Sequence, residues 1–140
     1  MHTSPLVSEY MTPNPHVIGA EQPLSRAHDI MRENELRHLP VLHGGTLVGL
    51  VSRGDLHLVE TMPDVDREKV SVEEAMSRDV YGVGPDELLV SVVRAMTARK
   101  LGSAVILDQG KVVGIFTVID ALRVLDRALG ALTRGDVRLD

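Results

Sequence analysis

The chain has 140 residues, of which 44% are hydrophobic and 25% charged, and this length and composition fit one compact globular domain. The absence of cysteine excludes a disulfide framework and thiolate chemistry. A net charge of −5 and only three aromatic residues, Tyr10, Tyr81 and Phe116, argue against nucleic-acid binding. Because no apolar run approaches the roughly 20 residues of a membrane span and Met1–Pro5 does not resemble a secretory signal, we expect a cytoplasmic protein that does not enter the membrane.

The chain contains an internal repeat. Residues 7–57 align with residues 72–122 without a gap, at an offset of 65 positions, and twelve aligned pairs are identical. These pairs are Val7/Val72, Glu9/Glu74, Met11/Met76, Gly19/Gly84, Leu24/Leu89, Met31/Met96, Leu36/Leu101, Leu42/Leu107, Gly45/Gly110, Val48/Val113, Gly49/Gly114 and Asp55/Asp120. The two copies therefore predict the same succession of elements.

In the first copy, a short strand at His16–Ile18 ends at Gly19 and a helix follows near Pro23. The apolar stripe of this helix consists of Leu24, Ala27, Ile30 and Met31. A hairpin then turns at Gly44-Gly45, and its strands cover 39–42 and 47–51. A last helix is expected to start near Asp55.

The second copy repeats this order. Its short strand covers Val80–Val83 and ends at Gly84, and its helix carries the stripe Leu89, Val92, Val93 and Met96. The strands of its hairpin cover 104–107 and 112–116, around Asp108-Gln109-Gly110, and the last helix starts near Asp120.

All four hairpin strands are continuously apolar, which predicts central sheets that are covered on both faces. We therefore predict an α+β (α/β) fold in which two βαββα units are related by a pseudo-twofold axis and form one module with a cleft between them. The predicted parts are the first copy at 7–58, a charged linker at 59–71, the second copy at 72–125, and the end of the last helix with a tail at 126–140.

The helix that contains residues 88–96 is apolar over more than one stripe. One interpretation is that it also contacts a second subunit, and we therefore expect a homodimer. The alternative is that it is deeply buried within one chain.

A hydroxyl and a carboxylate recur three residues apart at the two junctions from hairpin to last helix. They are Ser52 and Asp55 in the first copy and Thr117 and Asp120 in the second. A carboxylate in this position can accept the hydroxyl protons of a ribose, while the hydroxyl and the first helical N–H groups can bind phosphate. The same spacing is also that of a helix capping box, which needs no ligand.

These features together resemble a pair of CBS (cystathionine beta-synthase) domains of the stand-alone bacterial kind, over Val7 to Leu125. The repeat, the strand Arg37-His-Leu-Pro-Val-Leu42 and the ending Gly49-Leu-Val-Ser-Arg-Gly-Asp55 carry the resemblance. It implies a disc-like, usually dimeric regulatory module that binds AMP, ADP, ATP or a related adenosyl ligand in its clefts, with no catalytic domain. It also implies that Asp55 and Asp120 hold the ribose.

The resemblance further places basic residues before the apolar hairpin strand, where they meet phosphate. In the first copy these are Arg37 and His38, and Arg53 adds charge beside Asp55. The second copy has Gly102 and Ser103 instead, with Val118 and Ile119 before Asp120, so the two sites should not be equivalent. Because aromatic residues are scarce, we expect the adenine to lie between aliphatic side chains, namely Ile18, Val83, Val41 and Ile106.

Neither metal chemistry nor catalysis is predicted. The six histidines, at positions 2, 16, 28, 38, 43 and 57, lack the spacing of a metal site, and no nucleophile has a plausible base. His38 is a candidate pH-sensitive phosphate contact. We expect no enzyme activity and no resident cofactor, and magnesium beside the nucleotide is left open. A partner protein would read the ligand-bound state; the alternative function is an interaction module that binds no small molecule.

Overall fold

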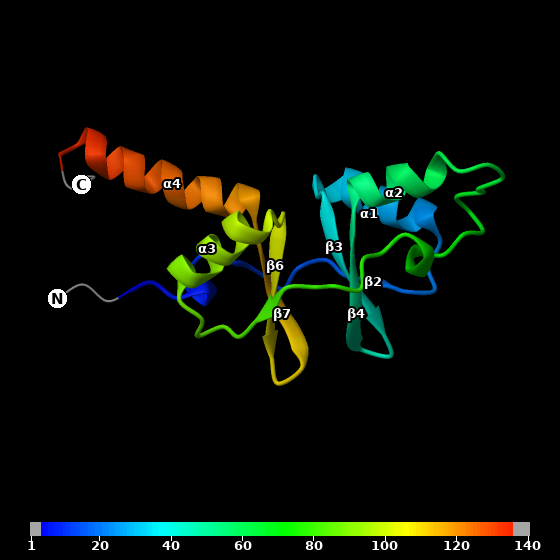
Figure 1. The fold of residues 1–140 in the computed structure, drawn as a ribbon, viewed down its shortest axis with the longest axis horizontal. Helices are drawn as coiled ribbons and strands as arrows, with labels where there is room; N and C mark the ends of the chain where they lie inside the picture. Colours follow the sequence, from blue (N-terminus) through cyan, green and yellow to red (C-terminus); the bar gives the residue numbers. More distant parts are fainter. Residues whose placement is uncertain (1–3, 136–140) are drawn as a thin grey trace.

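The computed structural model describes residues 4–135 and places two sheets next to each other in the middle of the molecule (Figure 1). The first sheet has the strand order β2-β3-β4 and the second β1-β7-β6-β5. Helices α1 and α2 lie on the outer side of the first sheet, and α3 and α4 on the outer side of the second. The predicted fold class, two βαββα units in one module, is confirmed.

The first half consists of β2 (Ile18–Gly19), α1 (Leu24–Asn34), β3 (His38–His43), β4 (Thr46–Ser52) and α2 (Arg53–Glu60). The second half consists of β5 (Gly82–Val83), α3 (Leu89–Arg99), β6 (Ser103–Asp108), β7 (Lys111–Thr117) and α4 (Val118–Thr133). Each hairpin strand extends one residue beyond its predicted range at both ends. The predicted short strands at 16–18 and 80–83 are partly wrong, because only residues 18–19 and 82–83 pair with β3 and β6.

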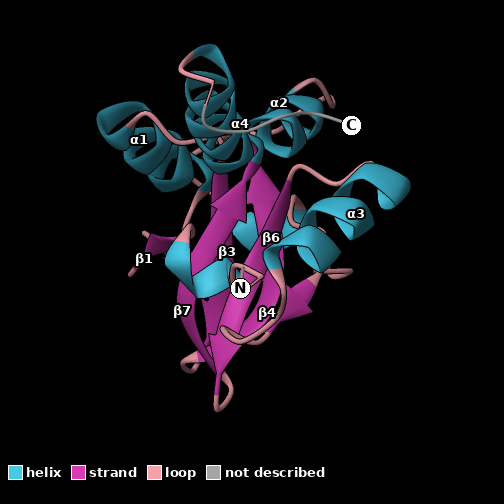
Figure 2. Cartoon of the chain, turned by 90° about the vertical axis from the view of Figure 1, so that its left-hand side faces the viewer, coloured by secondary structure: helices cyan, strands magenta, loops and turns pink. Residues whose placement is uncertain are grey.

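Helices α1 and α3 end in the same way. Glu35 and Lys100 each follow the last helical turn with a φ of 55°, the left-handed conformation that closes many helices. This reversal leads the chain directly into β3 and β6, and Figure 2 shows the strands running beneath the helices. Within residues 4–135, no helix is long and apolar enough to cross a membrane.

Each half has its own hydrophobic core, and each core also contains the first aligned residue of the other copy. Val7, in a 3-10 turn (Val7–Glu9), is buried in the core of the second half, whereas Val72, in the turn Val72–Glu74, is buried in that of the first. The sequence did not predict this exchange, because the repeat alone does not tell which half a leading segment packs against.

Backbone pairing follows the same exchange. Strand β1 (Thr12–Pro13) pairs with β7 of the second half, and Ser77 exchanges two hydrogen bonds of 2.8 and 2.9 Å with Leu50 of β4. The exchanged segments thus add backbone pairing to the last hairpin strand of the opposite copy.

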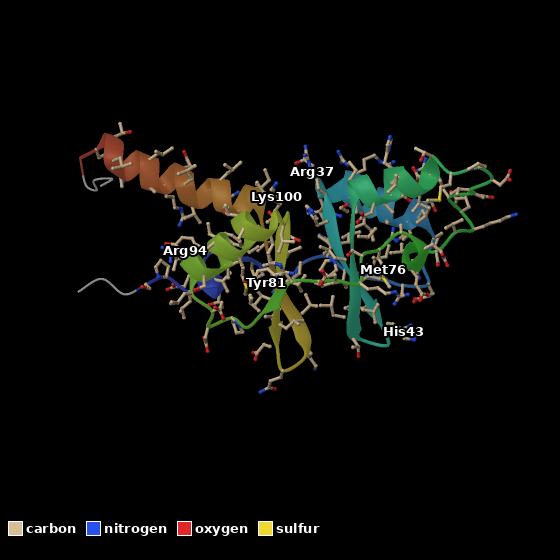
Figure 3. The ribbon with its side chains drawn as sticks, viewed as in Figure 1. Arg37, His43, Met76, Tyr81, Arg94 and Lys100 are labelled. Carbon is tan, nitrogen blue, oxygen red and sulfur yellow. The ribbon has the colours of Figure 1, made fainter. Side chains whose placement is uncertain are left out.

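Two of the identical repeat pairs are explained by this exchange. The side chain of Met11 lies on Gly114 of β7. The side chain of Met76, which is labelled in Figure 3, lies on Gly49 of β4. A Cβ atom at position 49 would lie 2.5 Å from Met76 Sδ and 2.9 Å from the Ser77 carbonyl oxygen. Glycine is required here because the exchanged segment passes so close to the strand.

We predict that Gly49→Ala destabilises the fold by about 1–3 kcal/mol, because the added methyl group overpacks against Met76 and a backbone oxygen. Thermal unfolding of the variant should occur several degrees below that of the parent protein, at about 2–4 °C per kcal/mol. Gly84→Ala is the matched control, since a Cβ at Gly84 meets nothing within 4 Å. Equal melting temperatures for the two variants would contradict the proposed packing.

Candidate functional site

The hairpin register of the first half gathers four of the predicted site residues. His38 is the Cα partner of Ser52 at the open end of the β3–β4 hairpin. One residue further out, the backbone N–H of Arg53 donates to the carbonyl oxygen of Arg37 over 2.9 Å. Arg37, His38, Ser52 and Arg53 therefore lie together where the hairpin gives way to α2.

These four residues line a pocket of about 410 Å³, together with Gly54 and His57. His57 was not predicted as a site residue. Its signal in the sequence is its position four residues after Arg53, which places both side chains on one face of α2. A volume of this size lies within the range of small-molecule sites in proteins.

The pocket lies at the seam, which we define as the boundary where β4 contacts β7 and the two halves meet. A Cβ atom at Gly102 of the second half would lie 2.9 Å from His38 Nε2, so the imidazole reaches across the seam. Arg37 and Lys100, from opposite halves, are found at the same edge of the molecule, near its middle (Figure 3). Several cationic side chains therefore gather at this edge, although the chain as a whole is acidic.

The surroundings of His38 change its pKa. Partial burial lowers the pKa of His38 below its ordinary value of 6.5; Asp55 acts against this shift and Arg37 adds to it. The imidazole is therefore mainly neutral at neutral pH. A phosphate placed between His38 and Arg37 would favour the protonated form.

The capping-box interpretation of the two Ser/Thr-x-x-Asp segments describes real contacts. The Asp55 backbone N–H donates to Ser52 Oγ over 3.0 Å, and the Ser52 N–H donates to Asp55 Oδ2 over 2.9 Å. Asp55 is half-buried and is not among the residues that line the pocket. The cap starts α2 at the pocket's edge, and sugar binding by Asp55 stays a prediction.

In the second half the equivalent residues have different surroundings. Thr117 and Asp120 form the same capping box, but Asp120 is only 4% exposed and also binds Thr12 and Arg123. Ser103, the counterpart of His38, is buried, and its hydroxyl has no hydrogen-bond partner among residues 4–135. The apolar residues Val118 and Ile119 are exposed where the first half has Arg53 and Gly54.

The four aliphatic residues predicted to surround the adenine form two cross-strand pairs. Ile18 pairs with Val41 in the first sheet, and Val83 pairs with Ile106 in the second. Val41 and Ile106 are fully buried, Ile18 is 4% exposed, and Val83 packs against the second core. All four are therefore core residues first, and their contact with a ligand stays a prediction.

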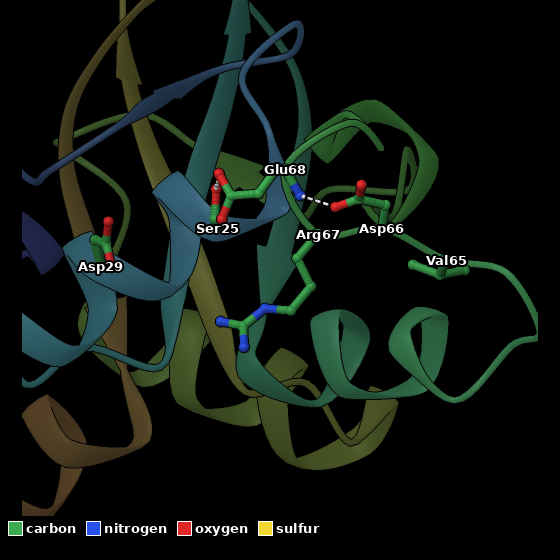
Figure 4. A pocket seen from close by; sticks show the side chains of 6 residues that line it. All are labelled: Ser25, Asp29, Val65, Asp66, Arg67 and Glu68. Carbon is green, nitrogen blue, oxygen red and sulfur yellow. Dashed lines mark hydrogen bonds between the residues drawn. The ribbon is translucent and has the colours of Figure 1, made fainter.

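A larger hollow, of about 590 Å³, lies between α1 and the segment 61–71 that links the copies (Figure 4). Its polar groups bind one another: Ser25 donates to Glu68 over 3.0 Å, and the Glu68 backbone N–H donates to Asp66 over 2.9 Å. Arg67 pairs with Glu60, which also contacts His28. These contacts hold the linking segment on α1. Within residues 4–135, no three His, Asp or Glu side chains are grouped to hold a metal ion.

Comparison with known proteins agrees with this architecture. The family model for the CBS domain matches twice, at residues 7–59 and 72–127. A Vibrio cholerae protein described as a candidate acetoin utilization protein (AcuB) has a structure that superimposes with a TM-score of 0.84 at 26% identity, covering 94% of this chain and 98% of that one.

Two similar structures were solved with adenosine compounds. CBSX2 in complex with AMP has a TM-score of 0.74 at 26% identity, covering 88% of this chain and 97% of that one. The CBS domain pair of protein MJ0100, in complex with 5′-methylthioadenosine and S-adenosyl-L-methionine, has a TM-score of 0.77 at 25% identity, covering 86% and 99%.

Three curated relatives are 28–29% identical to this chain over the aligned region. They are longer than this chain, because the aligned region covers only 37%, 24% and 21% of their lengths. The family model matches both halves of the repeat, and the two matches include the exchanged segments and the starts of both capped helices. The chain belongs to the CBS-domain family, as a pair of CBS domains.

Proposed function

We propose that this CBS pair is a regulatory module that binds an adenine nucleotide in the pocket at the seam. The observation that carries the proposal is the grouping of Arg37, Arg53, His38 and His57 around one hollow at the start of α2. Cationic groups beside a helix N-terminus favour an anion, and phosphate is the anion that an adenosyl ligand most often carries. The AMP complex of CBSX2 supports adenine nucleotides as the class to test.

The position of the pocket supports a role in signalling. His38 contacts the second half at Gly102, and a ligand that moves His38 therefore changes a contact between the halves. A ligand shifts a conformational equilibrium only through contacts that differ between the two states, and a contact across the seam meets this requirement. The proposal puts the module in the cytoplasm, without catalysis of its own, where a partner protein reads the change.

Removing the two arginines should weaken nucleotide binding. We predict that Arg37→Ala/Arg53→Ala raises the Kd for ADP by at least roughly 10- to 100-fold, because the loss of only one hydrogen bond to a charged group already costs about 1.5–3 kcal/mol. Isothermal titration of the full chain at fixed ionic strength measures this change. Arg94→Ala is the matched control, because Arg94 is exposed on α3, away from Arg37 (Figure 3). An unchanged Kd in the double variant would refute the phosphate role of the pocket.

Nucleotide affinity should also depend on pH through His38. Burial lowers the pKa of His38 in the free protein, and a bound phosphate raises it again, so that binding takes up a proton between these two pKa values. Affinity should therefore rise as the pH falls from 7.5 towards 6. His38→Gln should flatten this rise, whereas His43→Gln, at the far end of the hairpin, should not. Protonation of the nucleotide itself affects the parent protein and both variants equally, so it cancels when their pH dependences are compared.

The homodimer is likewise a proposal, which the helices of the second half support. Val118, Leu122, Leu125 and Leu129 of α4 are each 47–51% exposed and follow the spacing 4-3-4 of a helix-pairing stripe. Val90 and Val93 of α3, and Leu88 just before it, are 38–42% exposed, so this helix is not buried on all sides within the chain. We propose that a second copy covers this surface.

Charges on the stripe should separate the subunits. We predict that Leu122→Glu/Leu129→Glu shifts the protein from a dimer to a monomer of 15.3 kDa in light scattering after size exclusion. Leu58→Glu, on α2 and 64% exposed, is the control and should leave the dimer intact. A parent protein that is monomeric at high micromolar concentration would rule this interface out.

A nucleotide-independent interaction module is the second candidate function. It is favoured by the observation that both acidic motif residues cap helices without a ligand and that α4 presents an apolar stripe. Titration of the parent protein with AMP, ADP and ATP separates the two candidates, because only the first predicts binding heat.

A further inference from the structure

We infer that Thr12 and Arg123 close the carboxylate of Asp120 to ligands, so that each chain binds one nucleotide, at Asp55. This inference rests on the proposed function and adds which of the two repeat-related carboxylates is available and which residues decide it. It depends on how many acceptor positions of each carboxylate the protein itself fills.

An ionised carboxylate offers about four acceptor positions on its two oxygens. At Asp120, Oδ2 accepts the backbone N–H of Thr117 at 2.8 Å and its hydroxyl at 3.1 Å. Oδ1 accepts the hydroxyl of Thr12 at 2.9 Å and Nη1 of Arg123 at 3.3 Å. The protein's own donors therefore fill all the positions that sugar hydroxyls would need.

Asp55 has the same backbone position but a different occupancy. Its Oδ2 accepts the Ser52 N–H at 2.9 Å, and its Oδ1 accepts no hydrogen bond from the part of the chain that the structure describes. Asp55 is half-buried, whereas Asp120 is 4% exposed. The carboxylate of the first half therefore keeps one oxygen available for a sugar.

The difference comes from two aligned positions of the repeat. Arg123 corresponds to Leu58, one position beyond the aligned ranges at the same offset of 65, and leucine has no donor. Thr12 aligns with Ser77, which makes no side-chain hydrogen bond to Asp55 in the described part of the chain. Thr12 belongs to β1, the exchanged strand that pairs with β7. The closing contact therefore joins the leading segment of the first copy to the start of α4.

A sugar at Asp120 would have to displace both donors of Oδ1. Breaking the bond from Thr12 leaves the buried Asp120 carboxylate without one of its donors, and it removes a side-chain contact between β1 and the second half. Arg123 also forms an ion pair with Asp120, although its side chain is 72% exposed. The ligand thus meets an occupied carboxylate in one half and an available one in the other.

The test is the number of nucleotides bound per chain, measured by isothermal titration with ADP. We expect one site in the parent protein, and its loss in Asp55→Ala. Thr12→Val/Arg123→Leu removes both donors to Oδ1 and gives position 123 the leucine of the first copy, so a second, weaker site is expected. Two variants serve as controls. Thr12→Ser keeps the hydroxyl that binds Asp120, and Ser77→Ala changes the residue that aligns with Thr12, so each should still bind one nucleotide.

Circular dichroism melting checks the fold of the double variant. If that variant does not fold, Arg123→Leu alone frees one acceptor position through an exposed side chain, and binding heat beyond one equivalent is expected. Two sites in the parent protein, or a single site in every folded variant, would overturn the inference while leaving the proposed function in place. No binding heat from any of these proteins would overturn both.

Discussion

The exchange of leading segments between the two copies is the constraint on which the rest of the structure depends. Val7 and Val72 each complete the core of the opposite half, and β1 and Ser77 each add backbone bonds to the opposite hairpin. A single copy of about 50 residues buries a smaller share of its surface than a larger domain does and would be marginally stable by itself. Because neither half is complete without the other copy, the seam has a fixed register, and the basic residues at its end are held next to Gly102.

The same local motif has different surroundings in the two halves. At each junction from hairpin to last helix, a hydroxyl and a carboxylate cap the helix, as the sequence spacing requires. In the first half the cap lies beside a cluster of cationic side chains. In the second half the acidic residue is buried under Thr12 of the exchanged strand, and apolar residues take the place of the cations. The cap therefore leaves Asp55 Oδ1 without a hydrogen-bond donor among residues 4–135, whereas Thr12 and Arg123 both donate to Asp120 Oδ1.

The sequence was sufficient for much of the fold. The offset of 65 residues, the apolar hairpin strands and the stripe of α1 predicted the elements in their order, because periodicity and repeats are local signals. The exchange could not be predicted, since Val7 and Val72 are identical and either could pack in either core. The left-handed residues Glu35 and Lys100 were also missed, because glycine is the usual residue in that conformation.

For the candidate site, the proximity of Arg37, His38, Ser52 and Arg53 followed from the hairpin register and was predictable. The surroundings of Asp120 were not, because Thr12 lies 108 residues away in sequence and approaches only through the exchanged strand. A crystal structure of the protein grown with ADP tests the account most directly. The account predicts phosphate oxygens against Arg37 and Arg53 and the ribose hydroxyls on Asp55, with Thr12 still bound to Asp120. Ribose on Asp120, with Asp55 bound only to Ser52, would contradict it.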